Sequence, residues 1–220
     1  MAVHRVLFCM LVFTALFFGV GQAVGETCTF ERDYAYKAPG SSAVYYITES
    51  CTKRPFDHAE IFFTYFTSWG QVEAAPAQAL RAIPDDPLGF MPYGPLYDPK
   101  YGAIVKTVAD LKVYLLLGGK KHWITSEIVF NALRYEWSWI EDVDPRLLAA
   151  YSEGGEIIDT SRHPDFTLIK YAGDPKVYRL EPGADGATVK RHIDDEGAFA
   201  AFGFRTDRIV TIPPTEKYSD

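Results

Sequence analysis

The sequence predicts an α+β protein of three tandem repeats, each a β-hairpin, a short helix and a strand, packed as a linear array or as a pseudo-symmetric body. A lysine, six further residues and a Val-Tyr pair occur three times, starting at Lys37, Lys106 and Lys170. A basic-then-apolar segment follows each pair and ends at Phe56, Ile124 and Ile193. A residue typical of helix N-caps comes next, at Asp57, Thr125 and Asp194, with spacings of 68 and 69 positions. Landmarks in one order at near-constant spacing indicate an internal repeat.

The first half of each repeat predicts a β-hairpin. In copy two, an apolar run meets Gly118 and Gly119 and is followed by a second short run that ends at Ile124. Two glycines supply the positive φ of a tight turn, so this pattern is typical of a hairpin. Copy three lengthens the same turn with the segment EPGADGAT.

The second half of each repeat predicts a short helix and a final strand. Asp57 and Glu60 have the spacing of a capping box. Five positions beyond each cap stands an aromatic residue: Phe62, Phe130 and Phe199. Residues 139–143 and 208–212 read as the final strands of copies two and three, and a proline then begins another turn or helix. Because one such unit buries too little surface alone, neighbouring units are expected to stack.

The N-terminus predicts export. Residues 1–25 carry a basic start, an apolar run of about 15 residues and small residues at Ala23 and Gly25, whereas a membrane-spanning helix needs about 20 apolar residues. Cleavage after Gly25 is our first expectation and cleavage after Ala23 the second. Repeat 1 then covers residues 26–93, repeat 2 residues 94–158 and repeat 3 residues 159–220. We expect a protein secreted to the periplasm or the extracellular space, without membrane insertion once the signal peptide is removed.

The charge balance argues against two classes of partner. The whole chain has a formal net charge of −7, and removal of residues 1–25 takes away only Arg5, which leaves −8. Nucleic acids and anionic membrane surfaces select for basic faces. We therefore expect no nucleic-acid partner, and an envelope protein or a polysaccharide instead.

Cysteine usage agrees with export. Cys9 lies in the signal peptide, which leaves Cys28 and Cys51 in the exported chain. Two cysteines in an oxidising compartment are expected to pair, and this loop would contribute about 3 kcal/mol by the chain-entropy estimate. Two free thiols or an intermolecular link are the alternatives. Two cysteines without histidines at ligand spacing do not complete a tetrahedral metal shell, so no metal site is expected here.

The chain resembles a tandem repeat of exported bacterial proteins. The segments GDPKVYRLE, KRHI, AFAAFGF and DRIVTI carry the resemblance, which covers roughly residues 34–218. It is clearest in copies two and three. Copy one departs from the pattern, with Pro55 in its basic segment and no glycine after its helix. The resemblance implies an extracellular or envelope module of a family without an established activity.

We find no pattern of a catalytic or cofactor site and expect a non-enzymatic protein. His122 and His192 are assigned equivalent places in the repeat, and a residue that recurs with the scaffold is more often structural than catalytic. The sequence has no nucleophile elbow, zinc-protease helix or phosphate-binding glycine loop. Acidic clusters such as Asp194-Asp195-Glu196 lack the alternating spacing of a calcium loop. Glu136 and Glu141 as a glycosidase pair are weaker still.

Aromatic residues are the candidate ligand-binding residues: Trp123, Trp69 and Trp137. Aromatic faces stack on sugar rings, so an exposed row of these residues would indicate a carbohydrate-binding module. The alternative is that they belong to the core. Trp123 is the better candidate for an exposed position, since copies one and three have no tryptophan there. Our first expectation is a structural or protein-interaction module of the cell envelope or the extracellular space, and carbohydrate binding is the second.

Overall fold

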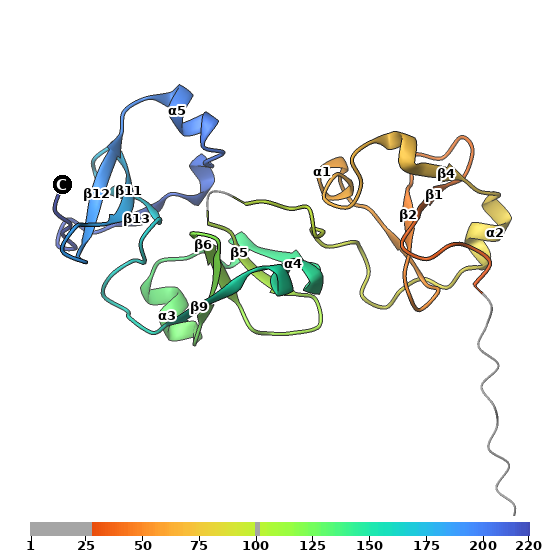
Figure 1. Cartoon of the computed structure of the whole chain (residues 1–220), viewed down its shortest axis with the longest axis horizontal. Helices are drawn as coiled ribbons and strands as arrows, with labels where there is room; N and C mark the ends of the chain where they lie inside the picture. Colours follow the sequence, from red (N-terminus) through yellow and green to blue (C-terminus); the bar gives the residue numbers. More distant parts are fainter. Residues whose placement is uncertain (1–27, 100–101) are drawn as a thin grey trace, which may run out of the picture.

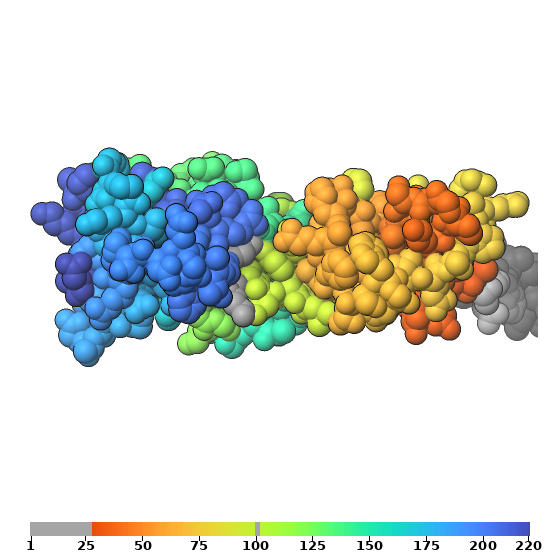
Figure 2. Space-filling view, turned by 90° about the horizontal axis from the view of Figure 1, so that it is seen from above, coloured from red at the N-terminus to blue at the C-terminus, as the bar shows by residue number. Residues whose placement is uncertain are grey.

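The computed structural model describes residues 28–99 and 102–220, so the predicted signal peptide lies outside the described residues. This part of the chain forms three separate β-sheets with short helices beside them (Figure 1). The predicted α+β class with hairpin, helix and strand units is confirmed. The three units follow one another along the long axis of the molecule, as the linear alternative requires (Figure 2).

Repeat 1 forms a four-stranded sheet in the order β3-β2-β1-β4. Its elements are β1 (Ala35–Lys37), β2 (Tyr45–Ile47), β3 (Lys53–Pro55), α1 (Ala59–Phe62), the 3-10 turn η1 (Trp69–Gln71), β4 (Val72–Ala74) and α2 (Ala77–Ala82). Strands β1, β2 and β3 pair antiparallel, and β4 lies parallel to β1. The parallel pairing follows because a crossover containing α1 returns the chain to the same end of the sheet.

Repeat 2 has the same order with one strand added, β8-β5-β6-β7-β9. Its elements are β5 (Ile104–Thr107), β6 (Tyr114–Leu117), β7 (Lys120–Ile124), α3 (Glu127–Ala132), η2 (Trp137–Trp139), β8 (Ile140–Val143), α4 (Pro145–Ala150) and β9 (Ser152–Ile157). Gly118 and Gly119 join β6 to β7 with φ of 57° and 75°, which confirms the predicted hairpin. Strand β9 runs parallel to β7 at the edge of the sheet.

Repeat 3 returns to four strands, in the order β12-β11-β10-β13. Its elements are β10 (Leu168–Tyr171), β11 (Val177–Pro182), β12 (Thr188–Ile193), α5 (Glu196–Ala201), η3 (Thr206–Arg208) and β13 (Val210–Ile212). The hairpin β11–β12 is longer than its counterparts, as the extended turn predicts. In Figure 1, α5 stands away from the strands of its own sheet.

Cross-strand pairing shows which residues correspond between repeats. The matching pairs are Tyr45 with Pro55, Tyr114 with Trp123, and Tyr178 with His192. Trp123 and His192 therefore hold equivalent places. The expected equivalence of His122 with His192 is wrong by one residue, because the two histidines point to opposite faces of their sheets.

The three helices begin one residue later than predicted. The N-caps are His58, Ser126 and Asp195 in place of Asp57, Thr125 and Asp194. The predicted capping box is wrong, since α1 has no side-chain cap hydrogen bond. In repeat 2 the reason is visible: the backbone N–H of Thr125 still donates to Ile157 at 3.3 Å, so this residue belongs to the strand pairing.

Each sheet has two faces, and the face on the side of α1, α3 or α5 is called the helix face. The other, the rear face, is covered by α2 in repeat 1 and by α4 in repeat 2. The helix face of repeat 1 buries Ala35, Val44, Tyr46, Phe62, Phe66 and Met91. Its rear face buries Tyr36, Ile47, Ala75, Leu80 and Ile83. Alternation along the short strands thus feeds two small cores in one unit.

One lysine anchors the end of every repeat. Lys53, Lys121 and Lys190 correspond in the strand register, and each ammonium group donates to a backbone carbonyl, at 2.5 Å to Ile83, 3.1 Å to Leu148 and 3.1 Å to Tyr218. Each also pairs with an acidic residue two to five positions further on: Asp85, Glu153 and Asp220. The lysine side chains are 11 to 17% exposed. We call this arrangement the lysine anchor.

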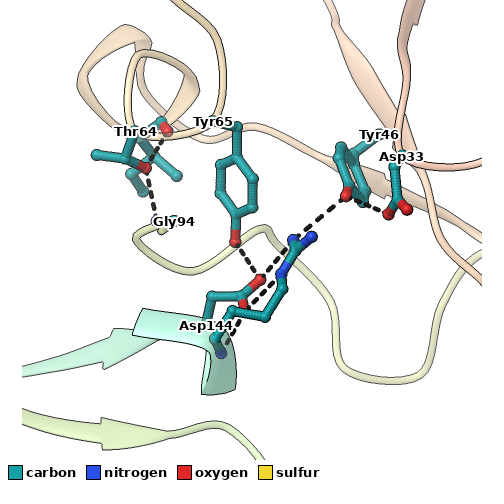
Figure 3. Close-up of polar contacts among 8 residues, drawn as sticks. Asp33, Tyr46, Thr64, Tyr65, Gly94 and Asp144 are labelled. Carbon is teal, nitrogen blue, oxygen red and sulfur yellow. Dashed lines mark hydrogen bonds and ion pairs between the residues drawn. The ribbon is translucent and has the colours of Figure 1, made fainter. Parts of the chain in front are cut away.

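A polar network joins repeats 1 and 2 (Figure 3). The Arg146 guanidinium donates to both carboxylate oxygens of Asp144 at 3.0 Å and to the Tyr46 hydroxyl at 3.4 Å. The Tyr65 hydroxyl donates to Asp144 at 3.2 Å, and the Tyr46 hydroxyl donates to Asp33 at 2.5 Å. The junction is therefore made by side chains at the start of α4 and on repeat 1. The backbone of Tyr93 adds hydrogen bonds to Asp142 and Asp144 at 2.9 and 2.7 Å.

Repeats 2 and 3 are joined differently, by one continuous hydrophobic cluster. The members from repeat 2 are Ile104, Leu115, Leu117, Ile124, Val129, Phe130, Leu133, Tyr135, Trp139 and Ile157, and those from repeat 3 are Ile169, Leu180, Val210, Ile212 and Tyr218. Buried His163 lies beside this cluster, with its ring nitrogens 2.8 Å from Glu216 and from the Leu133 carbonyl. Arg208 adds an ion pair to Glu141 at 3.1 Å.

Candidate functional site

Trp69 and Trp137 occupy one repeated position, the first residue of the 3-10 turn after the helix. Trp69 stacks on Phe62 with ring centroids 4.2 Å apart, and Trp137 stacks on Phe130 at 4.3 Å. The two tryptophans are 50 and 52% exposed. One ring face of each is therefore used by the scaffold, and the two side chains lie on different sheets.

Trp123 lies on the other face of the repeat 2 sheet. It is half-buried opposite Tyr114, and the ammonium group of Lys112 lies 5.0 Å from its ring centroid. Because Trp123 precedes Ile124, whose side chain is in the helix-face cluster, its own side chain faces the rear. The structure thus does not bring Trp123 and Trp137 together into one aromatic surface.

Repeat 3 differs from the other two in the seating of its helix. Phe62 and Phe130 are 0 and 2% exposed, whereas α5 has no buried residue and Phe199 is only half-buried. The register explains this difference. Arg179 stands where repeats 1 and 2 have Tyr46 and Leu115. A guanidinium group on the helix face removes apolar area that a short helix needs for packing.

On the helix face of repeat 3, a polar network lies where repeats 1 and 2 have apolar residues. Arg179 lies 5.0 Å from the ring centroid of Phe166 and 5.7 Å from that of Phe204. Its guanidinium group is 3.5 Å from Glu181, which stands where repeat 2 has Leu117. These contacts hold the arginine against the sheet and leave space beneath α5.

An open groove of about 670 Å³ lies between α5 and the sheet of repeat 3. Val177, Ile193, Phe199 and Ile209 give it an apolar floor and wall. Thr206 also lines it, at the position where repeats 1 and 2 carry the stacked tryptophans. A small side chain at that position leaves Phe199 without the ring that covers its counterparts.

In repeats 1 and 2 the same region is closed by the segment that leads to the next repeat. We name these segments connector 1 (residues 83–97) and connector 2 (residues 152–167). Met91 of connector 1 is 4% exposed in the helix-face cluster and donates its backbone N–H to Pro55 at 2.9 Å. Ile157 of connector 2 is 7% exposed and lies opposite Ile124. Each connector therefore runs along the edge strand and inserts one aliphatic side chain under the helix.

The connectors also cover the end of each helix. Tyr65, Leu133 and Phe202 correspond, since each lies seven residues after its N-cap. Connector 1 places Gly94 against the Tyr65 ring, so closely that an added Cβ would lie 2.6 Å from it. The Leu133 carbonyl accepts a hydrogen bond from His163 of connector 2. Leu133 is 1% exposed, whereas Phe202 is 57% exposed.

The edge strand beside the groove is also largely unpaired. The N–H of Lys190 donates outward to Ser219 at 2.8 Å, and a bridge joins Val189 to Ser219. Within residues 28–99 and 102–220, no strand pairs with the outer edge of β12 beyond that point. The backbone N–H and C=O groups of His192, two residues after Lys190, are directed to the same outer side. The groove and this edge together form the candidate site, which we call the repeat 3 site.

The histidines take structural positions. Burial lowers the pKa of His122, which packs against Gly154, and His163 is held between repeats 2 and 3. Among the residues that the structure describes, no three His, Cys, Asp or Glu side chains gather as a metal site. The described helices are at most six residues long, and none is long and apolar enough to cross a bilayer.

Cys28 and Cys51 form the predicted disulfide, with Cα atoms 5.5 Å apart. It ties the first described residue to the turn after β2, beside the rear-face cluster of repeat 1. The sequence predicts this pair and offers the tryptophans as candidates, but it does not predict the repeat 3 site. The signal that it lacked was the register, which alone shows that Arg179 replaces an apolar residue.

No protein-family model and no curated protein sequence matches the chain. Solved structures that share similarity with it include two of a membrane complex. One is the periplasmic assembly from the ESX-5 inner membrane complex, with 11% identity, a TM-score of 0.21, and coverage of 89% of this chain and 59% of that chain. The other is an intact ESX-5 inner membrane complex, with 10% identity, a TM-score of 0.22, and coverage of 84% and 50%. This chain spans between half and three fifths of theirs.

Proposed function

We propose that the chain is an exported, non-enzymatic protein-interaction module whose repeat 3 is the docking unit. The observation that carries the proposal is the contrast in Leu133 and Phe202, which are 1 and 57% exposed at one repeated position. Repeats 1 and 2 cover this position and fill the space beneath their helices, and repeat 3 leaves both open. An apolar groove bordered by an unpaired strand edge is typical of a protein-binding surface.

Export is supported by two independent features. The disulfide between Cys28 and Cys51 is of the kind that forms and persists in oxidising compartments. The first 25 residues have the order of a signal peptide. A role in the periplasm or outside the cell follows, either as an adaptor or as a structural component of the envelope.

A site-specific photo-cross-linking experiment tests the proposal. A benzophenone side chain replaces Phe202, at the open site, and in a control protein it replaces Ile128, which is 76% exposed on α3 of repeat 2. The oxidised, exported protein is irradiated with the exported proteins of the organism that makes it. We expect a discrete, saturable cross-link to another protein from position 202 and not from position 128. Equal labelling at both positions, or none at position 202, would contradict the proposal.

The same protein preparations distinguish the protein-interaction proposal from the carbohydrate-binding alternative. Trp123, Trp69 and Trp137 lie on two faces and two sheets, so polysaccharide binding would have to use one tryptophan at a time. Saturable glycan binding that is lost in Trp123→Ala, with no cross-link at position 202, would replace the protein-interaction proposal with the carbohydrate one.

A further inference from the structure

We propose that the repeat 3 site takes an extended segment of a partner protein, which lies parallel to β12 and inserts one aliphatic side chain into the groove beneath α5. This inference rests on the proposed function and specifies the chemistry of the partner. The chain itself contains two examples of the complex, because connectors 1 and 2 bind the equivalent places in repeats 1 and 2.

Pairing at the edge of the sheet sets the direction and the starting point of the bound segment. Strand β9 pairs parallel with β7, and the bridges Lys53–Asp85 and Val189–Ser219 are parallel as well. All three repeats thus accept a strand of one direction at this edge. In repeat 3 the lysine anchor already holds Asp220, which corresponds to Glu153 of β9. A segment that continues this pairing along β12 would occupy the stretch that corresponds to residues 154–163.

The strand register sets where the side chain of the bound segment enters the groove. Ile157 lies opposite Ile124 in the register of β9 and β7, and Ile124 corresponds to Ile193. Ile193 lines the groove, together with Val177 and Phe199. An aliphatic residue held opposite Ile193 would enter an apolar space, as Ile157 and Met91 do in their own repeats.

The C-terminal end of the bound segment would lie against the end of α5. In connector 1, the N–H of Leu96 donates to the Thr64 carbonyl at 2.9 Å, and in connector 2, His163 donates to the Leu133 carbonyl. Both acceptors lie one or two residues beyond the end of the helix, where carbonyls lack helical partners. At α5 the corresponding residues are Ala201 and Phe202. A hydrogen-bond donor five or six residues after the aliphatic residue would therefore complete the match, as Leu96 follows Met91 and His163 follows Ile157.

The charge of the site favours a segment of this kind over a charged one. Arg191 is paired with Glu181, and Lys190 with Asp220. The groove itself combines Lys176 and His192 with the acidic residues that begin α5. Three carboxylates stand against one lysine in the groove, so charge attraction does not select an acidic segment. Main-chain pairing and one apolar side chain therefore carry the recognition, as in other cases of strand addition.

The probe is a synthetic peptide with the sequence of residues 154–163, GGEIIDTSRH, labelled with a fluorophore at its N-terminus. Binding to the oxidised, exported protein is followed by fluorescence anisotropy. We expect saturable binding that weakens about tenfold or more when the residue corresponding to Ile157 is replaced by aspartate, since a tenfold change equals about 1.4 kcal/mol. A scrambled peptide of the same composition should not bind.

Protein variants place the peptide on repeat 3. Phe202→Asp changes an exposed residue, and Ile193→Asp changes the groove, and each should weaken binding about tenfold while far-UV circular dichroism remains unchanged. Ile128→Asp on α3 is the matched control and should bind as the wild type does. If Ile193→Asp binds the peptide normally, the peptide has displaced β9 from repeat 2 instead, and the inference is overturned.

Different outcomes contradict the docking function and the extended-segment inference. A specific cross-link from position 202 without peptide binding would retain the docking function and overturn the extended-segment inference in favour of a globular partner. A cross-link from position 202 to a second copy of this chain would show that the occupant is the protein itself, which also overturns the inference. Peptide binding together with a cross-link to a different protein is the expected outcome.

Discussion

Repeat 1 meets repeat 2 through tyrosines, Asp144 and Arg146, whereas repeat 2 meets repeat 3 through a hydrophobic cluster shared by both. The same unit is thus joined to its neighbour in two ways. A shared core makes two units one cooperative body, because neither buries its apolar surface alone. At the first junction, Tyr46 and Asp144 are 5 and 9% exposed but Arg146 is exposed, and an ion pair with an exposed partner contributes far less free energy than a shared core. The molecule should therefore behave as one unit, repeat 1, tethered to a second body made of repeats 2 and 3.

The largest effect is expected from Leu133→Ala. This side chain is 1% exposed and belongs to the cluster shared by repeats 2 and 3. Removal of a buried leucine side chain to the β-carbon lowers the free energy of unfolding by about 2–5 kcal/mol. Hydrogen exchange under mild denaturant should show repeats 2 and 3 losing protection together while repeat 1 keeps its own. Destabilisation confined to repeat 2 would mean that the two are not one body.

The next effect concerns repeat 1 alone. Loss of the disulfide in the double variant Cys28→Ser, Cys51→Ser opens a loop with a sequence separation of 23 and should lower the stability of repeat 1 by about 3 kcal/mol. Chemical denaturation followed by intrinsic fluorescence should then show two transitions, with the earlier one reporting Trp69. A single transition shifted as a whole would contradict the independence of repeat 1.

A smaller effect is expected at the polar junction. Tyr65→Phe removes the hydrogen bond to Asp144 and should weaken the contact between repeats 1 and 2 by about 0.5–1.5 kcal/mol. Distance distributions between fluorophores placed on repeats 1 and 2 should broaden, whereas those between repeats 2 and 3 should not change. Tyr34→Phe, at a tyrosine that is 42% exposed, is the matched control.

The smallest effect depends on pH. Burial raises the pKa of Asp144, but hydrogen bonds from the Arg146 side chain and backbone outweigh burial and hold this pKa below the usual 3.8. A carboxyl with a lowered pKa in the folded state stabilises the fold above its unfolded pKa, and this contribution is lost as the pH falls through the folded value. The same fluorophore pair should separate below about pH 3.8. A step of equal size in Asp144→Asn would assign it to another group.

The opposite end of the pH scale gives a second measure of the same junction. Burial and the hydrogen bond to Asp33 raise the pKa of Tyr46 to about 12. A tyrosine with a raised pKa stabilises the fold below its unfolded value, near 10, and loses that contribution as the pH rises through the folded one. Tyrosine absorbance should show several hydroxyls that ionise late, because burial also raises the pKa of Tyr36, Tyr65, Tyr135, Tyr151 and Tyr218. Tyr46→Phe should remove one of them.

The sequence predicted the larger features of the fold because each left a local mark. Gly118 and Gly119 identify the tight turn, Cys28 and Cys51 identify the disulfide, and the spacing of the Val-Tyr pairs identifies the order of the elements. Helix starts were misplaced by one residue because these helices span only four to six residues and carry no periodicity of their own.

The candidate site could not be predicted in the same way. It exists because Arg179 and Thr206 replace an apolar residue and a tryptophan that cover the same region in repeat 2. Only the cross-strand register shows that these residues are equivalent, and strands of three to six residues do not specify register from sequence alone. The exposure of Trp69 and Trp137 was also beyond prediction, since each uses one ring face in stacking and leaves the other free.

The bond between Cys28 and Cys51 also sets how far the protein can be stretched. A chain whose units lie in a row, and whose first junction is the weaker one, should yield under tension at that junction and then unravel one body at a time. Residues 29–50 cannot extend while the disulfide holds, so the contour length of the unravelled oxidised chain is shorter by about 70–80 Å than that of the reduced chain. The contour length of the stretched protein would then show whether the disulfide is oxidised or reduced.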